Sequence, residues 1–365
     1  MNRNIIVLMA YFVVPFLMLE GCGSTNTQTD EPELNDVWVE PKVEKAPLFP
    51  VREDGLYGFI DKKGNMVVEP QFIDVIRGGF SEGLVFVKKN NESGAKWGAL
   101  DSTGEIVIEP QFCEVRRFSE GLAAVQMYED SLWGYIDVKG DWAIEPRFER
   151  AIPFSEELAV VKANEKWGAI DKNGTFVIEP QFDGMGEFSE GLASVRINDK
   201  YGFIDDKGKM VIVPQFDEAW WNFSGGMCAV YVDDKCGLID ENGKWIFEPN
   251  YFEDIIPISE GIWQASMDNG SFAYVDSAGS VFDFVYEYYD GLCSCPTTDG
   301  KYGYINKNGE FDIAAQYDVA YEFNNGLALV GIGEGFNSSD TKPWEKGMWG
   351  YIDTKGNMVY YSICE

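Results

Sequence analysis

A phrase of eight residues recurs nine times between Tyr57 and Gly356, and it constrains the fold more than any other feature of this chain. With small variations it reads aromatic, Gly, two apolar residues, Asp and a turn ending in Gly, as in WGAIDKNG from Trp167. Successive copies lie 40, 36, 34, 34, 35, 36, 30 and 47 residues apart, so the period is near 35. A unit of this size cannot hold a core alone, so neighbouring units must cover one another.

Two further phrases, EPQF and FSEGLA with their variants, recur with the same period as the first. In the unit of Trp167 the apolar runs predict strands over Leu158–Lys162, Trp167–Asp171 and Thr175–Glu179. Pro180 ends the third strand because it lacks a backbone donor. Residues 181–191 are then a connection with two aromatic residues that can pack back on the sheet. Each unit is therefore predicted to have three short strands and a packed loop.

The fold class that follows is all-β, a tandem array of about nine three-stranded units. The strands are apolar almost continuously, which predicts that both faces of each small sheet are buried. A β-propeller and an open curved or solenoid-like array both satisfy this pattern. We favour the open array, because a propeller blade usually has four strands and propellers usually have fewer than nine blades. The chain also begins on a first strand (Leu48–Glu53) and ends on a third (Asn357–Ile363), so no strand exchange closes a ring.

Taken together, the three phrases resemble the WG (or KWG) repeat family of bacteria, over about 310 of the 365 residues. The resemblance implies a β-repeat scaffold, commonly in surface or secreted proteins. It implies no common catalytic residue and no common ligand.

The N-terminal segment is a targeting signal rather than part of the fold. Arg3 precedes an apolar run from Ile5 to Leu19, and Leu19-Glu20-Gly21-Cys22 resembles a bacterial lipoprotein signal, although Glu20 departs from the usual small or apolar residue. The resemblance implies a lipid on Cys22. We expect a signal peptide over residues 1–21, a flexible tether over 22–47 and the repeat domain over 48–365. The predicted location is the cell envelope, at the inner or outer membrane, periplasmic or surface-exposed.

Composition excludes several classes of function. The chain has no histidine, which removes Ser-His-Asp and Cys-His nucleophiles and His-containing zinc sites. Its net charge of −32 disfavours nucleic acid as a partner, because that affinity comes largely from basic residues that neutralise phosphates. Six cysteines remain beside Cys22, an even number that permits disulfides, although units without cysteine look just as complete. We expect no metal and no cofactor.

The recurring side chains are best explained as structural. Burying one aromatic residue contributes about 2 to 3 kcal/mol, so the aromatic residues of the eight-residue phrase are expected to be core rather than a sugar-binding surface. They are Tyr57, Trp97, Trp133, Trp167, Tyr201, Phe272, Tyr302 and Trp349. The recurring Asp is explained by turn capping rather than by a calcium ladder, and the Gly by a backbone or ring close to it.

Function is expected where the units differ. Insertions at residues 90–95, 127–131 and 331–346 all fall between the first and second strands, so they should project from one edge of the array. The candidate ligand-binding residues are Phe336, Asn337 and Trp344 in the longest insertion, and Trp220 and Trp221 in a connection that is elsewhere polar or small. The alternative for the longest insertion is a disordered hairpin tip, and the alternative for Trp220 and Trp221 is simple packing.

These features predict a non-catalytic, lipid-anchored envelope protein that presents a surface to a protein or glycan partner. One alternative is a structural spacer without a specific ligand. A carboxylate-based glycoside hydrolase is a further alternative, but Glu residues that recur in most units mark architecture rather than a catalytic pair.

Overall fold

The computed structural model describes residues 48–363 except 92–93, 221, 253, 260–261, 267–271, 283–287, 298–299, 307–309 and 334–347. The predicted signal peptide and tether, with Cys22, lie outside the described residues. Regular structure in the described part consists of 34 strands in nine antiparallel sheets.

The sheets follow one another along the chain. The first has β1 (Phe49–Glu53), β2 (Leu56–Ile60) and β3 (Met66–Phe72), and the second has β4 (Asp74–Val75), β5 (Leu84–Asn91), β6 (Gly94–Asp101) and β7 (Ile106–Phe112). The third has β8 (Glu114–Val115), β9 (Leu122–Gln126), β10 (Trp133–Asp137) and β11 (Trp142–Phe148), and the fourth has β12 (Arg150–Ser155), β13 (Leu158–Ala163), β14 (Lys166–Ile170) and β15 (Phe176–Phe182). The fifth has β16 (Gly184–Met185), β17 (Leu192–Ile197), β18 (Lys200–Asp205) and β19 (Met210–Phe216), and the sixth has β20 (Glu218–Ala219), β21 (Met227–Val232), β22 (Lys235–Asp240) and β23 (Trp245–Phe252). The seventh has β24 (Asp254–Ser259), β25 (Ile262–Ser266), β26 (Phe272–Asp276) and β27 (Val281–Phe282), the eighth has β28 (Cys293–Pro296), β29 (Tyr302–Ile305) and β30 (Phe311–Tyr317), and the ninth has β31 (Val319–Ala320), β32 (Leu327–Ile332), β33 (Met348–Asp353) and β34 (Met358–Ile363).

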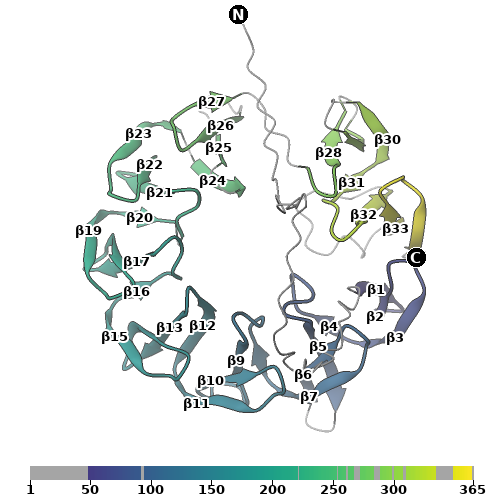
Figure 1. Ribbon diagram of the computed structural model, residues 1–365, viewed down its shortest axis with the longest axis horizontal. Coiled ribbons are helices and arrows are strands. Elements are labelled where there is room, and N and C mark those ends of the chain that lie inside the picture. Colours follow the sequence, from purple (N-terminus) through teal and green to yellow (C-terminus); the bar gives the residue numbers. More distant parts are fainter. Residues whose placement is uncertain are drawn as a thin grey trace, which may run out of the picture.

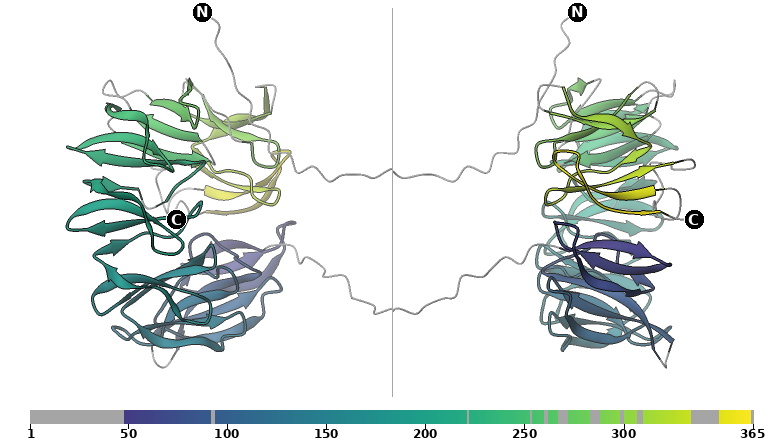
Figure 2. Two further views of the ribbon diagram at one scale, coloured as in Figure 1. Left: turned by 60° about the vertical axis from the view of Figure 1, so that its left-hand side comes forward. Right: turned by 90° about the vertical axis from the view of Figure 1, so that its right-hand side faces the viewer.

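The sheets are the blades of a nine-bladed β-propeller (Figure 1). Strands such as β12 and β24 lie toward the centre, and strands such as β11, β15 and β19 form the outer rim. Side views show the blades following one another around the ring as separate sheets (Figure 2). The propeller alternative is therefore confirmed, and our preference for an open array was wrong.

The ring closes because the first and last blades bury each other's apolar faces. Phe49 and Val51 of β1 share one buried cluster with Trp349 and Tyr351 of β33. The Tyr351 hydroxyl donates a hydrogen bond to the Pro50 carbonyl over 3.2 Å. In the described residues no strand from one end of the chain joins the sheet of the other end, so closure rests on side-chain packing rather than on strand exchange.

The prediction of three strands per unit was also wrong, because seven of the nine sheets have four. The additional strand is the innermost and comes from the stretch between the EPQF and FSEG phrases. In the fifth blade it is β16, where Gly184 and Met185 pair with Arg196 and Val195 of β17. Two residues are too few to give a periodic signal, which is why the sequence indicated only a connection.

The motif glycine is explained by a bulge in the outermost strand, as expected from a close backbone. Trp167 pairs with Phe182 and Ala169 with Ile178, so residues 179–181 all stand opposite Gly168. A Cβ on Gly168 would lie 2.4 Å from the Ile178 carbonyl oxygen. The glycine of one phrase and the proline-containing bulge of the other therefore require each other.

The recurring Asp caps the turn between the second and third motif strands, as predicted. Asp171 accepts hydrogen bonds from the backbone amides of Asn173 at 2.9 Å and Thr175 at 2.8 Å. The Thr175 bond is the largest cause that lowers the pKa of Asp171 below its usual range. Asp61, Asp137, Asp205, Asp240, Asp276 and Asp353 accept the same pair of amide bonds.

The cores lie between neighbouring blades. One buried cluster, for example, contains Tyr135 and Phe148 of the third blade and Val161 and Ile170 of the fourth. Each of the eight buried clusters of the described residues joins two neighbouring blades.

The FSEG phrase joins one blade to the next through polar contacts. The Ser155 hydroxyl donates to the Phe188 carbonyl over 2.8 Å, and the Glu156 carboxylate accepts from the Gly191 amide over 2.9 Å. Equivalent Ser bonds are made by Ser81, Ser119 and Ser189, and equivalent carboxylate bonds by Glu82, Glu120, Glu190 and Asp290. The recurring Glu thus has a structural role that explains its presence in most units.

Candidate functional site

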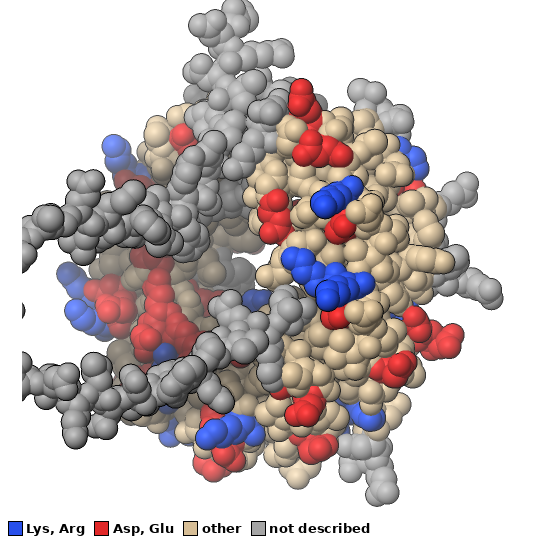
Figure 3. Space-filling view, turned by 45° about the vertical axis from the view of Figure 1, so that its right-hand side comes forward, with Lys and Arg blue, Asp and Glu red and all other residues tan. Residues whose placement is uncertain are grey.

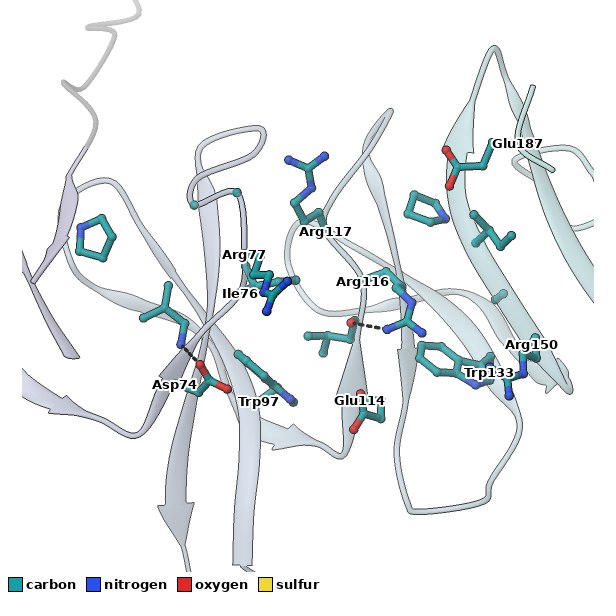
Figure 4. Close-up of a pocket in the computed structure, with 18 of the residues that line it drawn as sticks. Asp74, Ile76, Arg77, Trp97, Glu114, Arg116, Arg117, Trp133, Arg150 and Glu187 are labelled. Atoms are coloured by element: carbon teal, nitrogen blue, oxygen red, sulfur yellow. Dashed lines mark hydrogen bonds between the residues drawn. The ribbon is translucent and has the colours of Figure 1, made fainter. Parts of the chain in front are cut away.

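A cavity of about 970 Å³ opens along the inner strands of five consecutive blades, from the first to the fifth. We call it the arginine cavity. Its charged lining residues are Arg77, Arg116, Arg117, Arg150, Asp74, Glu114 and Glu187 (Figure 4). Its aromatic lining residues are Tyr57, Trp97, Trp133 and Trp167. Four of the chain's eight arginines therefore line one cavity in a protein whose net charge is −32.

The arginines come from equivalent places in neighbouring units. Arg116 and Arg117 are the fourth and fifth residues after Phe112, and Arg77 is the fifth residue after Phe72. Arg150 is the second residue after Phe148, where the preceding units have Asp74 and Glu114. Val115 and Ala151 are buried, so alternation along the strand turns Arg116 and Arg150 to the opposite face, toward the cavity, and Arg77 and Arg117 line the same cavity.

The four guanidinium groups differ in the contacts that they make. Arg116 lies over the ring of Trp133, 4.9 Å from its centroid, and donates to the Val115 carbonyl over 3.4 Å. Within the described residues Arg77, Arg117 and Arg150 are exposed and make no hydrogen bond or ion pair. A guanidinium presents several donors in a planar fork that matches carboxylate or phosphate oxygens. The cavity therefore contains three guanidinium groups that make no hydrogen bond with the described residues, and a fourth that lies over an aromatic ring.

The lining has four arginines against three carboxylates, so its formal charge is positive by one. On the face shown in Figure 3, basic and acidic side chains lie in small groups close to one another. Fields from remote carboxylates are screened over about 8 Å at physiological ionic strength, whereas a ligand inside the cavity touches the arginines directly. The acidity of the whole chain is thus compatible with a local site for anions.

Glu187 is a partly buried acidic residue of this lining (Figure 4). Burial raises the pKa of Glu187 above its ordinary value of 4.5, and the charge of Arg117 offsets only part of this effect. The folded protein therefore binds the carboxyl proton more tightly than the unfolded chain does.

We expect Glu187→Gln to raise the midpoint of thermal unfolding at pH 7. A raised pKa means that stability falls as the pH rises from 4.5 through the folded-state pKa, and Gln carries no such penalty. The gain should disappear when unfolding is measured below pH 4.5. Glu114→Gln is the matched control, because Glu114 is an exposed carboxylate of the same cavity, and an equal gain from it would contradict the burial explanation.

The family follows from comparison with known proteins. A family model described as WG containing repeat matches residues 57–92, 97–129, 133–167, 167–201, 201–236, 237–269, 302–335 and 349–363, which is more than half of the chain. The chain belongs to the WG repeat family. A comparison with curated protein sequences found no match.

Solved structures support the propeller fold. A crystal structure of a eukaryotic initiation factor aligns with a TM-score of 0.55 at 10% identity, covering 87% of this chain and 96% of that chain. Dihydro-heme d1 dehydrogenase NirN in complex with DHE aligns with a TM-score of 0.44 at 14% identity, covering 88% and 74%. Hsv2 of Kluyvelomyces marxianus aligns with a TM-score of 0.39 at 11% identity, covering 78% and 94%. At 10% identity the first of these alignments shows a likeness of fold alone.

The aromatic residues of the WG repeats contribute both to the cores and to the cavity. Tyr57, Trp97, Trp133 and Trp349 are buried, with at most 9% of their surface exposed. Trp167, Tyr201 and Tyr302 are partly buried, and Phe272 lies in β26. Tyr57, Trp97, Trp133 and Trp167 are also edges of the arginine cavity.

The residues predicted to bind a ligand are distributed differently. Phe336, Asn337, Trp344 and Trp221 lie outside the described residues. Trp220 is partly buried and lines a second cavity, described below. The arginine cavity itself was not predicted.

A signal for the arginine cavity was nevertheless present. In the WG repeats the stretch between EPQF and FSEG varies most from unit to unit, and three consecutive units place arginine there. This stretch was predicted to be a connecting loop, whereas it contains the innermost strand of the blade.

Among the described residues there is no group of three or more acidic or cysteine side chains that could hold a metal ion. The described cysteines, Cys113, Cys228, Cys236, Cys293 and Cys295, are not in disulfides. In the described part of the chain no helix is long and apolar enough to cross a membrane.

Proposed function

We propose that this chain is a non-catalytic binding protein of the bacterial cell envelope, held at the membrane by a lipid on Cys22, whose arginine cavity captures acidic groups of a glycan or protein partner. The observation that carries the proposal is the gathering of four arginines in one cavity of an acidic chain, three of which make no hydrogen bond or ion pair with the described residues. Unpaired guanidinium groups in a concave site are suited to a ligand that supplies the missing acceptors.

The ligand is short enough to fit within the cavity. A long polyanion such as nucleic acid would extend over a surface whose total charge is −32, so it is disfavoured. The tether before Leu48 would allow the ring to reach a partner beyond the membrane surface.

The experiment is a binding screen of residues 48–365 against acidic glycans, their neutral counterparts and acidic peptides. We expect saturable binding of acidic members, weakened about 100-fold in the double variant Arg117→Gln/Arg150→Gln, since a hydrogen bond to a charged group contributes about 1.5 to 3 kcal/mol.

The control is Lys207→Gln, which removes a positive charge from an exposed turn residue that does not line the cavity. It should bind like the wild type. If no acidic ligand binds, or if the double variant binds as tightly as Lys207→Gln, the proposal is wrong and a structural spacer becomes the better explanation.

A further inference from the structure

A second cavity, of about 650 Å³, adjoins the first on the inner side of the fourth to seventh blades. We call it the apolar cavity. Ile152, Trp220, Phe223 and Pro257 form most of its lining. Of the described residues that line it, Glu187 is the only charged one.

The two cavities are continuous. Ile152 and Glu187 line both of them, so the wall of one is also the wall of the other. A ligand held by the arginines can therefore extend past Ile152 without leaving the protein surface.

Trp220 distinguishes the apolar cavity from the equivalent places elsewhere in the ring. It is the fourth residue after Phe216, the place occupied by Arg116 in the third unit and by Gly186 in the fifth. Its ring packs partly on the cores of two blades and partly faces the cavity. A large aromatic ring that is left partly open at a concave site gains from contact with an apolar group.

The polarity of the two cavities is opposite. Basic groups line only the arginine cavity, and the Glu187 carboxylate lies where the two cavities meet. An anionic group is attracted to one side and repelled from the other, so an elongated ligand would bind in a single orientation.

From this juxtaposition we infer that the two cavities form one bipartite site, whose ligand is an organic anion joined to a compact apolar or aryl group. The anion lies among Arg116, Arg117 and Arg150, and the apolar group lies against Trp220 and Phe223. The inference rests on the proposed function and names the chemistry of its ligand.

The test uses two fluorescent probes with the same arene, anilinonaphthalene sulfonate and the neutral N-phenylnaphthylamine, with residues 48–365. We expect the sulfonate to bind about tenfold more tightly than the neutral probe, and Arg117→Gln/Arg150→Gln to remove this difference. Trp220→Ala should weaken both probes about tenfold. Asn222→Asp, at an exposed residue of the apolar cavity, should also weaken both probes and keeps the test valid if Trp220→Ala does not fold.

Two outcomes would overturn the inference and are distinguishable from each other. If the arginine variant weakens the sulfonate while both apolar-cavity variants bind normally, the bipartite site is wrong but the proposed function stands. If both probes depend on Trp220 or Asn222 and neither depends on the arginines, the bipartite site is wrong and the proposed function loses its support.

Discussion

Gly168→Ala is expected to lower the free energy of unfolding by about 3 kcal/mol, the upper part of the range for overpacking. The new Cβ would lie 2.4 Å from the Ile178 carbonyl oxygen and 2.8 Å from the Pro180 nitrogen. Both are backbone atoms of the bulge in β15, so no side-chain rotation can relieve the contact. The measurement is chemical denaturation of residues 48–365 followed by circular dichroism.

The matched control is Gly184→Ala, in the inner strand of the next blade. Its Cβ would lie 3.3 Å from the Arg196 Cβ and 3.5 Å from its Nε, so a shift of a few tenths of an ångström relieves the contact. We expect a change of about 1 kcal/mol or less. Equal costs for the two variants would show that the bulge does not require the glycine.

The strands of the motifs were predictable because their signals are local. Alternating turns and apolar runs placed the hairpin and third strand of each unit, and Asp171 and Gly174 marked the turn between them. The structure has strands at Leu158–Ala163, Lys166–Ile170 and Phe176–Phe182, within a few residues of the prediction. The third strand runs through Pro180 rather than ending there, because the proline lies on the outer edge of the blade, where its missing donor faces no neighbour.

Ring closure was predicted only as the alternative, because it depends on two segments at opposite ends of the chain. An open array needs polar faces on its terminal units. The first strand instead contributes Phe49 and Val51, and the last unit contributes Trp349 and Tyr351. Apolar residues on both terminal units were therefore a signal for closure, and we gave more weight to the absence of strand exchange.

The candidate site was only partly accessible from the sequence. Trp220 was recognised because it departs from its repeat, whereas the arginines are dispersed over residues 77–150 and meet only when the blades form a ring. The recurrence of arginine in three consecutive units was a signal, but their convergence in one cavity is a property of the tertiary arrangement.

Trp349→Ala is expected to cost about 3 to 5 kcal/mol and to loosen the junction between the first and ninth blades. Trp349 is 1% exposed and packs in the cluster that joins these blades, with the ring of Tyr360 6.0 Å away. Hydrogen exchange should show faster exchange of amides in β1 (Phe49–Glu53), because that strand loses the surface against which it is buried.

Trp167→Ala is the matched control, since Trp167 occupies the same motif position in the fourth blade, far from the junction. It should destabilise its own part of the ring while β1 keeps its protection relative to global unfolding. If Trp349→Ala leaves β1 as protected as Trp167→Ala does, the junction does not depend on this packing. Loss of protection confined to the first and ninth blades would instead mean that a nine-bladed ring without strand exchange is held closed by its buried aromatic side chains.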